Sequence, residues 1–309
     1  LTLSGAKDYG GSREKKPSIF LQETDLPLEP VNVKGSILAP EPVIDLENTE
    51  HPLTHYELKK RFSFTQLAAF RSCPLQYKFE HIYRIPKLGT FQKSFGQSVH
   101  LAFERMLYLH IQRSAGEQAS LFAAQTPKQP GFQVSREEAE EIFEDAWIDE
   151  WYDSRKRHDE YFALGKKAVA SFWKECSEQV PSVLSVERPF TLLLGKHSLK
   201  GKIDRVDDLG DGTVAILDYK TGTAKDELSP EDREQLYLYQ VALEHQGLKV
   251  AKMAYIYVGE WIKRDVEPLS ESKRAAFLEK IEERMAAILS SDFSPTPAPF
   301  TCRYCDFKQ

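Results

Sequence analysis

The pattern of hydrophobic and polar positions changes twice along the chain and divides it into three regions. Residues 1–55 show no sustained periodicity, and from Gln22 onward they are rich in proline and acidic residues, which is typical of an extended linker. From about Ser63, apolar residues recur at helical spacing, which predicts long helices. After Pro181 the pattern becomes a two-residue alternation rich in β-branched residues, which predicts strands.

The patterns predict the following elements, in this order: helices at 64–82, 92–113 and 135–178, strands at 183–194, 198–206 and 213–219, a helix at 231–244, a strand at 250–258 and a helix at 270–289. Ser63 is a plausible N-cap for the first helix, and Ser135 with Glu138 has capping-box spacing. The Gly-Asp-Gly turn at 210–212 joins two strands, so we expect the three consecutive strands to form an antiparallel meander.

Composition narrows the class of protein. A chain of 309 residues with 41% hydrophobic content can bury a full core. Because 28% of residues are charged and no apolar run approaches roughly 20 residues, we exclude a transmembrane protein and expect a cytoplasmic chain. Four cysteines are too few for a disulfide scaffold, and the spacing of Cys302 and Cys305 is typical of metal binding. The chain begins at Leu1 without a leader, so we expect a piece of a longer protein.

Charge is unevenly distributed along the chain. The net charge of −6 argues mildly against a nucleic-acid partner, but residues 56–98 hold eight basic residues against two acidic ones. Residues 136–160 hold eleven acids against four bases, which we interpret as a solvated helix face. The basic stretch is interleaved with aromatic residues, as in grooves that bind nucleic acid: Phe64, Phe70, Tyr77, Phe79 and Tyr83. We expect DNA contacts from four of its bases: Lys59, Lys60, Arg61 and Arg71.

Two acidic residues and a lysine form the strongest chemical pattern. Asp218 and Lys220 share one face of a predicted strand, and the preceding strand places Asp204 where it can lie across from Asp218. Two facing carboxylates repel each other unless a cation lies between them. Mg²⁺ or Mn²⁺ would bind these oxygens together with phosphate oxygens, and Lys220 would hold or help deprotonate an attacking water. Alone, however, Asp-x-Lys is a common tripeptide at the ends of surface strands.

Further motifs flank this pair. His100 follows Gly96 on a predicted helix, and Gln235 and Tyr239 share one face of a later helix. A single histidine is more often structural than a ligand, so the motif around His100 matters more than its residue type. Glu187 lies on the first predicted strand, and the sequence leaves open whether it is functional or a surface acid.

This ordered set resembles the PD-(D/E)XK nuclease domain of the RecB and AddAB type. The matching elements are His100, Gly201 with Asp204, Asp218-Tyr-Lys220-Thr-Gly222, and Gln235 with Tyr239. The resemblance covers about residues 60–309. It implies an α/β fold with a restriction-endonuclease-like mixed sheet core of order αβββαβ, a large helical insertion and an N-terminal helical region, in a domain spanning 56–309.

The resemblance also implies roles for individual residues. His100, Asp204, Asp218 and the Tyr219 carbonyl would bind the catalytic metal, Mg²⁺ or Mn²⁺. Lys220 would act on the nucleophile, and Gln235 and Tyr239 would support the site or touch DNA.

In the family's iron-sulfur members, an early cysteine and three late ones hold a cluster. Cys73, followed by Pro74, matches the early position, and Cys302 and Cys305 match two of the late ones. The resemblance therefore implies a [4Fe-4S] cluster whose fourth cysteine would lie beyond Gln309, with a Zn²⁺ site as the alternative. We interpret Cys176 as a small buried residue.

A second resemblance concerns residues 1–21, which look like the end of a UvrD/Rep-type superfamily 1 helicase motor core. The chain contains no Gly-x4-Gly-Lys-Ser/Thr loop, so we expect no ATPase activity, and residues 22–55 would tether the nuclease to the motor. The two resemblances together imply an exonuclease-type, metal-dependent DNA nuclease of the bacterial cytosol. It would belong to a helicase-nuclease that processes DNA ends in recombination or repair beside a second subunit. The alternative is a degenerate nuclease fold that binds DNA and scaffolds a partner.

Overall fold

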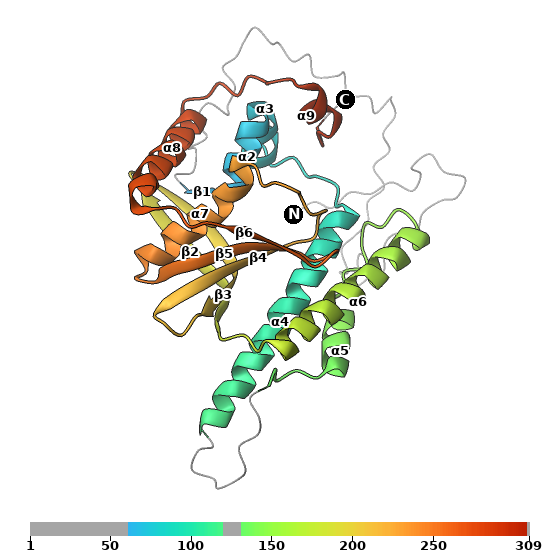
Figure 1. Cartoon of the computed structure of the whole chain (residues 1–309). Helices are drawn as coiled ribbons and strands as arrows, with labels where there is room; N and C mark the ends of the chain where they lie inside the picture. The colour runs from blue at the N-terminus through green and yellow to red at the C-terminus, as the bar shows by residue number, and fades with distance from the viewer. Residues whose placement is uncertain (1–60, 120–130, 308–309) are drawn as a thin grey trace, which may run out of the picture. The chain divides into compact units, whose positions relative to one another are not determined.

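The computed structural model describes residues 61–119 and 131–307 (Figure 1). The helicase-like segment at 1–21, the linker at 22–55 and the two lysines Lys59 and Lys60 lie outside the described residues, so those expectations stay predictions.

A mixed six-stranded sheet forms the centre of the described chain. Its strands are β1 (Arg61–Ser63), β2 (Val183–Leu194), β3 (His197–Asp208), β4 (Thr213–Lys220), β5 (Lys249–Tyr257) and β6 (Ile262–Val266). The meander β2–β3–β4 is antiparallel, as predicted, and the helix α7 (Pro230–His245) connects β4 to its parallel neighbour β5. The predicted α/β fold with an αβββαβ core is therefore confirmed.

Strand β3 is shared by three neighbours. Its pairing with β2 runs from His197 to Asp207 and occupies one edge. On the other edge, β1 pairs in parallel only at 198–200, and β4 pairs only at 205–208. No described strand pairs with residues 201–204 on that edge, so Asp204 lies at the point where the ladder opens. The register, which pairs Arg205 with Leu217, brings Asp204 next to Asp218.

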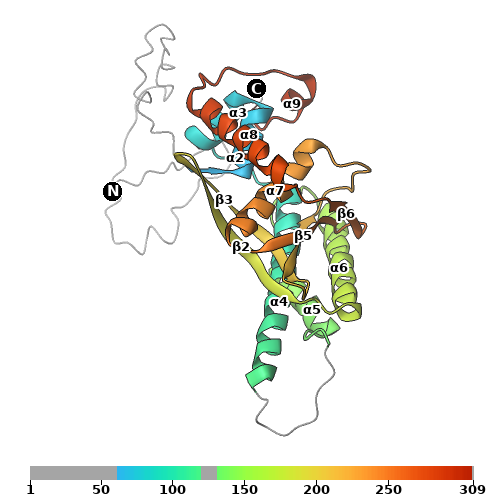
Figure 2. The same ribbon diagram turned by 60° about the vertical axis from the view of Figure 1, so that its left-hand side comes forward.

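Helices cover both faces of the sheet, as Figures 1 and 2 show. On one face lie α2 (Phe64–Ser72), α7 and α8 (Glu271–Leu289), and on the other α4 (Phe91–Ala119), α5 (Arg136–Ala146) and α6 (Arg155–Glu178). Each face of the sheet packs against its helices in a separate hydrophobic core, and side chains on opposite faces of a strand enter different cores. Ile216 packs into the first core, whereas Tyr219 packs into the second, between the aromatic rings of α4 and α6. The sheet is therefore anchored on both faces around the ends of β3 and β4.

Two predicted helices are broken in the structure. The helix predicted at 64–82 is divided at Cys73 into α2, α3 (Pro74–Tyr77) and a π-helical turn, η1 (Lys78–Ile82). Pro74 explains the division, because the residue before a proline disfavours the helical conformation, and Cys73 is extended with φ −164°. The helix predicted at 135–178 is likewise wrong as one element, since residues 147–154 separate α5 from α6.

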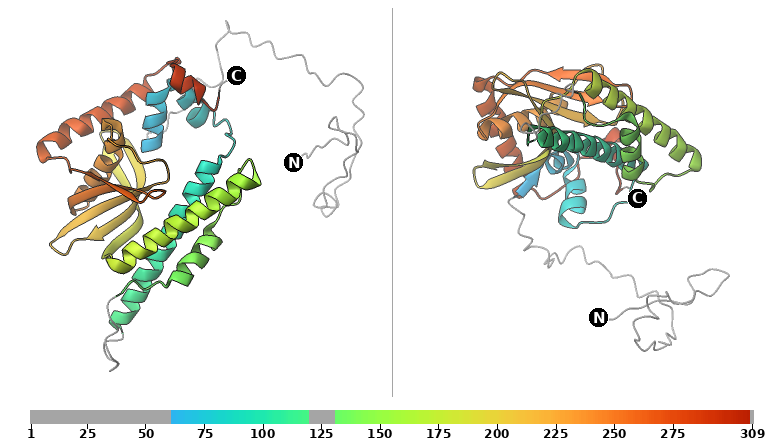
Figure 3. Two further views of the ribbon diagram at one scale, coloured as in Figure 1. Left: turned by 45° about the vertical axis from the view of Figure 1, so that its right-hand side comes forward. Right: turned by 90° about the horizontal axis from the view of Figure 1, so that it is seen from below.

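The C-terminal tail, residues 290–307, folds back onto the first helices. The ring of Phe293 stacks on Tyr77 with centroids 5.9 Å apart, and Thr296 Oγ1 donates to the Ser72 carbonyl at 3.5 Å. Phe307 packs edge-on against Phe79. The tail also contains the short helix α9 (Pro299–Arg303), which lies near the first helices (Figure 3). Tyr77 and Phe79 thus pack against the tail, so these two aromatic side chains of the stretch have an internal packing role.

Gly201 allows β2 and β3 to pack tightly. A Cβ at this position would lie 2.7 Å from Cε1 and Cζ of Phe190, a buried residue whose ring packs on Tyr239. We expect Gly201→Ala to lower the free energy of unfolding by about 1–3 kcal/mol, measured by urea denaturation. Gly259→Ala is the control, because a Cβ there meets nothing within 4 Å; an equal loss in both variants would contradict the steric explanation.

Candidate active site

The two strand acids lie at the opening of the ladder. Asp204 Oδ2 accepts a hydrogen bond from the Tyr219 amide at 2.9 Å, and Asp218 is 2% exposed. Burial, reinforced by the charge of Asp218, raises the pKa of Asp204 well above its usual range. The described chain thus holds one buried and one partly buried carboxylate whose negative charges repel each other, which is the arrangement predicted from the sequence.

Helix α4 brings His100 to these acids. Gly96 lies one turn earlier and would have its Cβ only 3.2 Å from Thr221 Oγ1, so the absence of a side chain lets the helix approach the end of β4. His100 Nδ1 is 3.4 Å from Asp204 Oδ2. Burial lowers the pKa of His100, and the charges of Asp218 and Glu187 oppose this shift only in part. A neutral imidazole has the free lone pair that a metal ligand needs.

Glu187 completes a group of three potential metal ligands. One atom each of His100, Glu187 and Asp204 lies within 4.8 Å of the other two. The β2–β3 register places Glu187 opposite Asp204, since Val186 faces Arg205 and Arg188 faces Ile203. Glu187 also has a φ of 46°, a left-handed conformation that costs a non-glycine residue energy and occurs often at functional sites. Two carboxylates and an imidazole are donors that fit Mn²⁺, and Mg²⁺ through the carboxylates.

A hydrogen-bonded chain lies beside this group. Lys220 Nζ is 2.7 Å from Asp218 Oδ2 and donates to Gln235 Oε1 at 2.8 Å. Gln235 Nε2 donates to Asp218 Oδ1 at 3.2 Å and to the Tyr239 hydroxyl at 2.6 Å. Burial, with the charge of Asp218, raises the pKa of Tyr239, so its phenol stays neutral. Gln235 therefore fixes Asp218 and Lys220 relative to each other.

The structure brings most of the predicted site residues together. Asp218 is not a member of the three-ligand group, and its Oδ2 is held in the ion pair with Lys220. The ligand set implied by the family resemblance omitted Glu187, and only the pairing register identifies it. The roles of these residues stay predictions.

Arg71 lies close to the site, and Arg61 is exposed on β1. Arg71 Nη1 is 3.0 Å from Glu234 Oε2, and Arg284 binds the same carboxylate with both of its terminal nitrogens. A pocket of about 210 Å³ separates α2 from α7 over the sheet, and both Arg71 and Lys220 line it. The predicted DNA contact at Arg71 therefore borders the candidate catalytic lysine.

The cysteines do not form a metal cluster in the described chain. Neither Cys73 nor the pair Cys302 and Cys305 belongs to any group of three ligands within 4.8 Å, whereas thiolates around one zinc ion would lie about 3.8 Å apart. The described residues therefore give no support to the iron-sulfur cluster or to the Zn²⁺ alternative, and both stay predictions. Cys176 is buried in the second core, as predicted, and burial raises its pKa to about 12.

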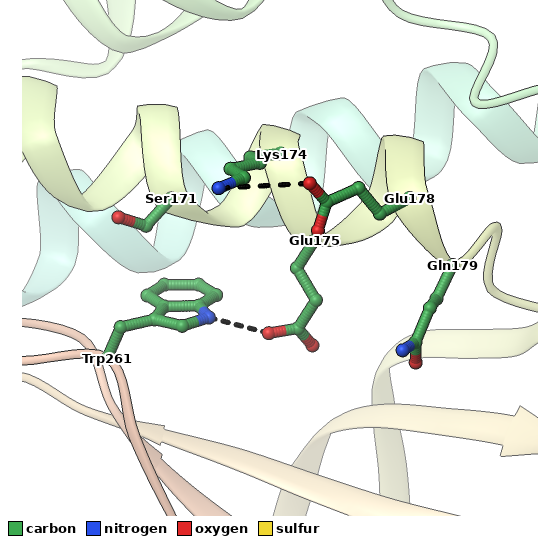
Figure 4. Close-up of a pocket in the computed structure, with 6 residues that line it drawn as sticks. All are labelled: Ser171, Lys174, Glu175, Glu178, Gln179 and Trp261. Atoms are coloured by element: carbon green, nitrogen blue, oxygen red, sulfur yellow. Dashed lines mark hydrogen bonds and ion pairs between the residues drawn. The ribbon is translucent and has the colours of Figure 1, made fainter.

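A second pocket, of about 290 Å³, lies where the β5–β6 turn packs on α6 (Figure 4). Trp261 Nε1 donates to Glu175 Oε2 at 2.6 Å, and Lys174 pairs with Glu178 along the helix at 3.8 Å. None of the predicted catalytic residues lines this pocket, and its two glutamates would repel a phosphate.

No described helix combines the length and apolar character needed to cross a membrane.

Comparison with known proteins extends these observations. Residues 61–309 match the model of the PD-(D/E)XK nuclease superfamily. The Gene 69 protein of Mycobacterium phage D29 is 24% identical over 285 residues, which cover 82% of this chain and 97% of that protein. One polypeptide of the ATP-dependent helicase/deoxyribonuclease of Streptococcus equi subsp. zooepidemicus is 36% identical over 86 residues, but these cover 25% of this chain and only 8% of that polypeptide.

Two solved structures resemble the chain distantly. A protein of Eubacterium rectale that is named as a candidate exonuclease has 14% identity and a TM-score of 0.48, covering 83% of this chain and 91% of its own. The protein SSO0001 has 16% identity and a TM-score of 0.38, covering 82% and 87%. Similarity at this level carries no functional argument.

Proposed function

Since this chain belongs to the PD-(D/E)XK nuclease superfamily, we propose that it is a metal-dependent deoxyribonuclease that hydrolyses phosphodiester bonds in DNA. The observation that carries the proposal is the group of His100, Glu187 and Asp204 beside the Asp218–Lys220 pair. A hard divalent cation bound there would supply charge stabilisation to a phosphoryl group.

The chain's own residues would bind the cation, orient the attacking water and position the lysine. His100, Glu187 and Asp204 would hold the cation, and the buried Oδ2 of Asp218 would face the same charge. Lys220, held by Asp218 and Gln235, would orient the attacking water and donate a hydrogen bond to the phosphate. Tyr239 would keep Gln235 in place without changing its own protonation.

The proposal is tested by incubating the protein with linear single-stranded and double-stranded DNA in Mg²⁺, in Mn²⁺ and in EDTA. We expect cleavage with either ion and none in EDTA. Stable DNA binding without cleavage in any ion would instead support the degenerate fold that binds DNA and scaffolds a partner.

We further propose that the nuclease works within a helicase-nuclease at DNA ends. The similarity to the Streptococcus helicase/deoxyribonuclease supports this, although it covers a small share of that polypeptide. Exonuclease polarity, the motor in the same parent chain and the iron-sulfur cluster belong to the same proposal. Measuring iron and zinc per mole of anaerobically purified protein that contains the native C-terminus, beside Cys73→Ser, tests the cluster: iron that is lost in the variant supports it, and iron-free protein contradicts it.

The basic residues Lys59, Lys60 and Arg61 are expected to contact the DNA backbone. Each phosphate contact that is lost should flatten the dependence of log affinity on log salt by about one unit, because fewer counterions are released. The measurement is a fluorescence anisotropy titration of single-stranded DNA at several salt concentrations with each residue changed to alanine. Arg155→Ala in the distant helix α6 is the control, and an unchanged slope in all three variants would reject this contact surface.

A further inference from the structure

The pocket between α2 and α7 contains features that the hydrolytic site does not use. Phe64, Ala68 and Arg71 occupy positions i, i+4 and i+7 of α2, so they share one helix face and form one wall. Tyr255 and Tyr257, at alternate positions of β5, form the opposite side. The pocket thus combines aromatic and apolar surface with a guanidinium at its edge.

Its geometry is fixed before any ligand binds. The Tyr255 hydroxyl donates to the Asp232 carbonyl at 2.6 Å, and Lys220 Nζ lies 4.8 Å from the centre of the Tyr255 ring. Glu234 is 4% exposed and holds Arg71 through Nη1, and among the described residues no other hydrogen bond engages this guanidinium. Further N–H donors of Arg71 therefore remain for an anion.

Size and chemistry select the occupant. At about 210 Å³ the pocket is smaller than the roughly 300–1,000 Å³ of sites for drug-sized ligands, so it has room for one planar base but not for a base pair. Tyr255 and Tyr257 are buried, so Phe64, which is half-buried, offers the ring on which a base can stack, and Arg71 and Lys220 are suited to the flanking phosphates. Two acids also line the pocket: Asp232 is paired with Lys225 at 2.6 Å, and Glu231 offers a carboxylate acceptor for an exocyclic amine.

We propose that this pocket binds one unpaired nucleobase next to the phosphate held at Lys220, so that the enzyme selects single-stranded DNA by its bases as well as by its charge. The inference rests on the proposed nuclease function, because Lys220 and Gln235 border both the pocket and the carboxylates. An unpaired base would enter between α2 and β5, whereas a paired base would have to leave its duplex first.

The test compares two fluorescein-labelled probes of equal charge, a 12-nucleotide thymidine strand and a 12-residue strand of abasic sites. Binding is measured by anisotropy with the full chain in EDTA, which prevents cleavage. We expect the unmodified protein to bind the strand with bases about 10-fold more tightly. Ala68→Trp, which fills the pocket, should abolish this difference and leave the affinity for the abasic strand unchanged, whereas Arg71→Ala should weaken both.

Thr65→Trp is the matched control, since Thr65 is exposed on α2 and does not line the pocket, and it should keep the 10-fold difference. Arg284 still binds Glu234 with both terminal nitrogens when Arg71 is removed, so the Arg71 variant should fold. Equal binding of the two probes by the unmodified protein, or a difference that survives Ala68→Trp, overturns the inference. Cleavage without base-dependent binding defeats the pocket alone, whereas base-dependent binding without cleavage defeats the nuclease proposal alone.

Discussion

Replacing Asp204 with asparagine is expected to lower the metal-dependent cleavage rate by about 1,000-fold or more. The reason is that the group formed with His100 and Glu187 loses one of its two charged metal ligands. The amide oxygen still accepts the Tyr219 N–H, so the strand ends stay in place. The substitution also removes a partly buried carboxylate that Asp218 repels. The metal-free variant should therefore melt at the same temperature as the unmodified protein or higher.

Single-turnover cleavage and calorimetric titration with Mn²⁺ measure the two effects separately. Metal affinity should fall together with the rate. A variant that loses activity and also melts at a much lower temperature would assign Asp204 a mainly structural role. If the variant keeps full activity, Asp204 is not a ligand of the catalytic metal.

Lys220→Ala is expected to lower the cleavage rate roughly 100-fold or more while metal affinity changes little, because Lys220 contacts Asp218 and Gln235 but is not in the ligand group. The measurement is the single-turnover rate as a function of Mn²⁺ concentration. The maximal rate should fall, and the concentration for half-maximal rate should stay within about 3-fold.

Lys263→Ala is the control, since this exposed lysine on β6 pairs only with the nearby Asp265 among the described residues. If Lys220→Ala instead shifts the Mn²⁺ dependence as strongly as Asp204→Asn does, Lys220 acts through the ligands and not on the nucleophile. The two substitutions together distinguish holding the cation from orienting the water.

The sequence predicted the sheet well where the hydrophobic alternation was long. The strand predicted at 183–194 has the bounds of β2, and the sequential order led directly to the meander. Strand β1, with three residues, and β6, with five, are too short for a periodic pattern and were missed. The division between α5 and α6 was missed because neither glycine nor proline marks it; Trp151 there has a φ of 68°, which its residue type does not suggest.

The candidate site was predictable to the extent that its residues lie in sequence motifs. Asp218 and Lys220 are two residues apart on one strand face, so their proximity followed from strand geometry. The approach of His100 depends on how α4 packs near Thr221, and the sequence indicated it only through Gly96. Glu187 could not be distinguished from a surface acid, because its position opposite Asp204 depends on the register of β2 against β3.

The contact between the tail and the first helices has a consequence for how the chain folds during synthesis. Thr296 and Ser72 are separated by 224 positions. Nearly the whole domain must therefore be synthesised before Phe293 can cover the apolar surface around Tyr77. Contacts of such high sequence separation form late and slow folding, since a long loop must close first. Until translation reaches the tail, the nascent helices present exposed aromatic rings, the kind of surface that chaperones protect from aggregation.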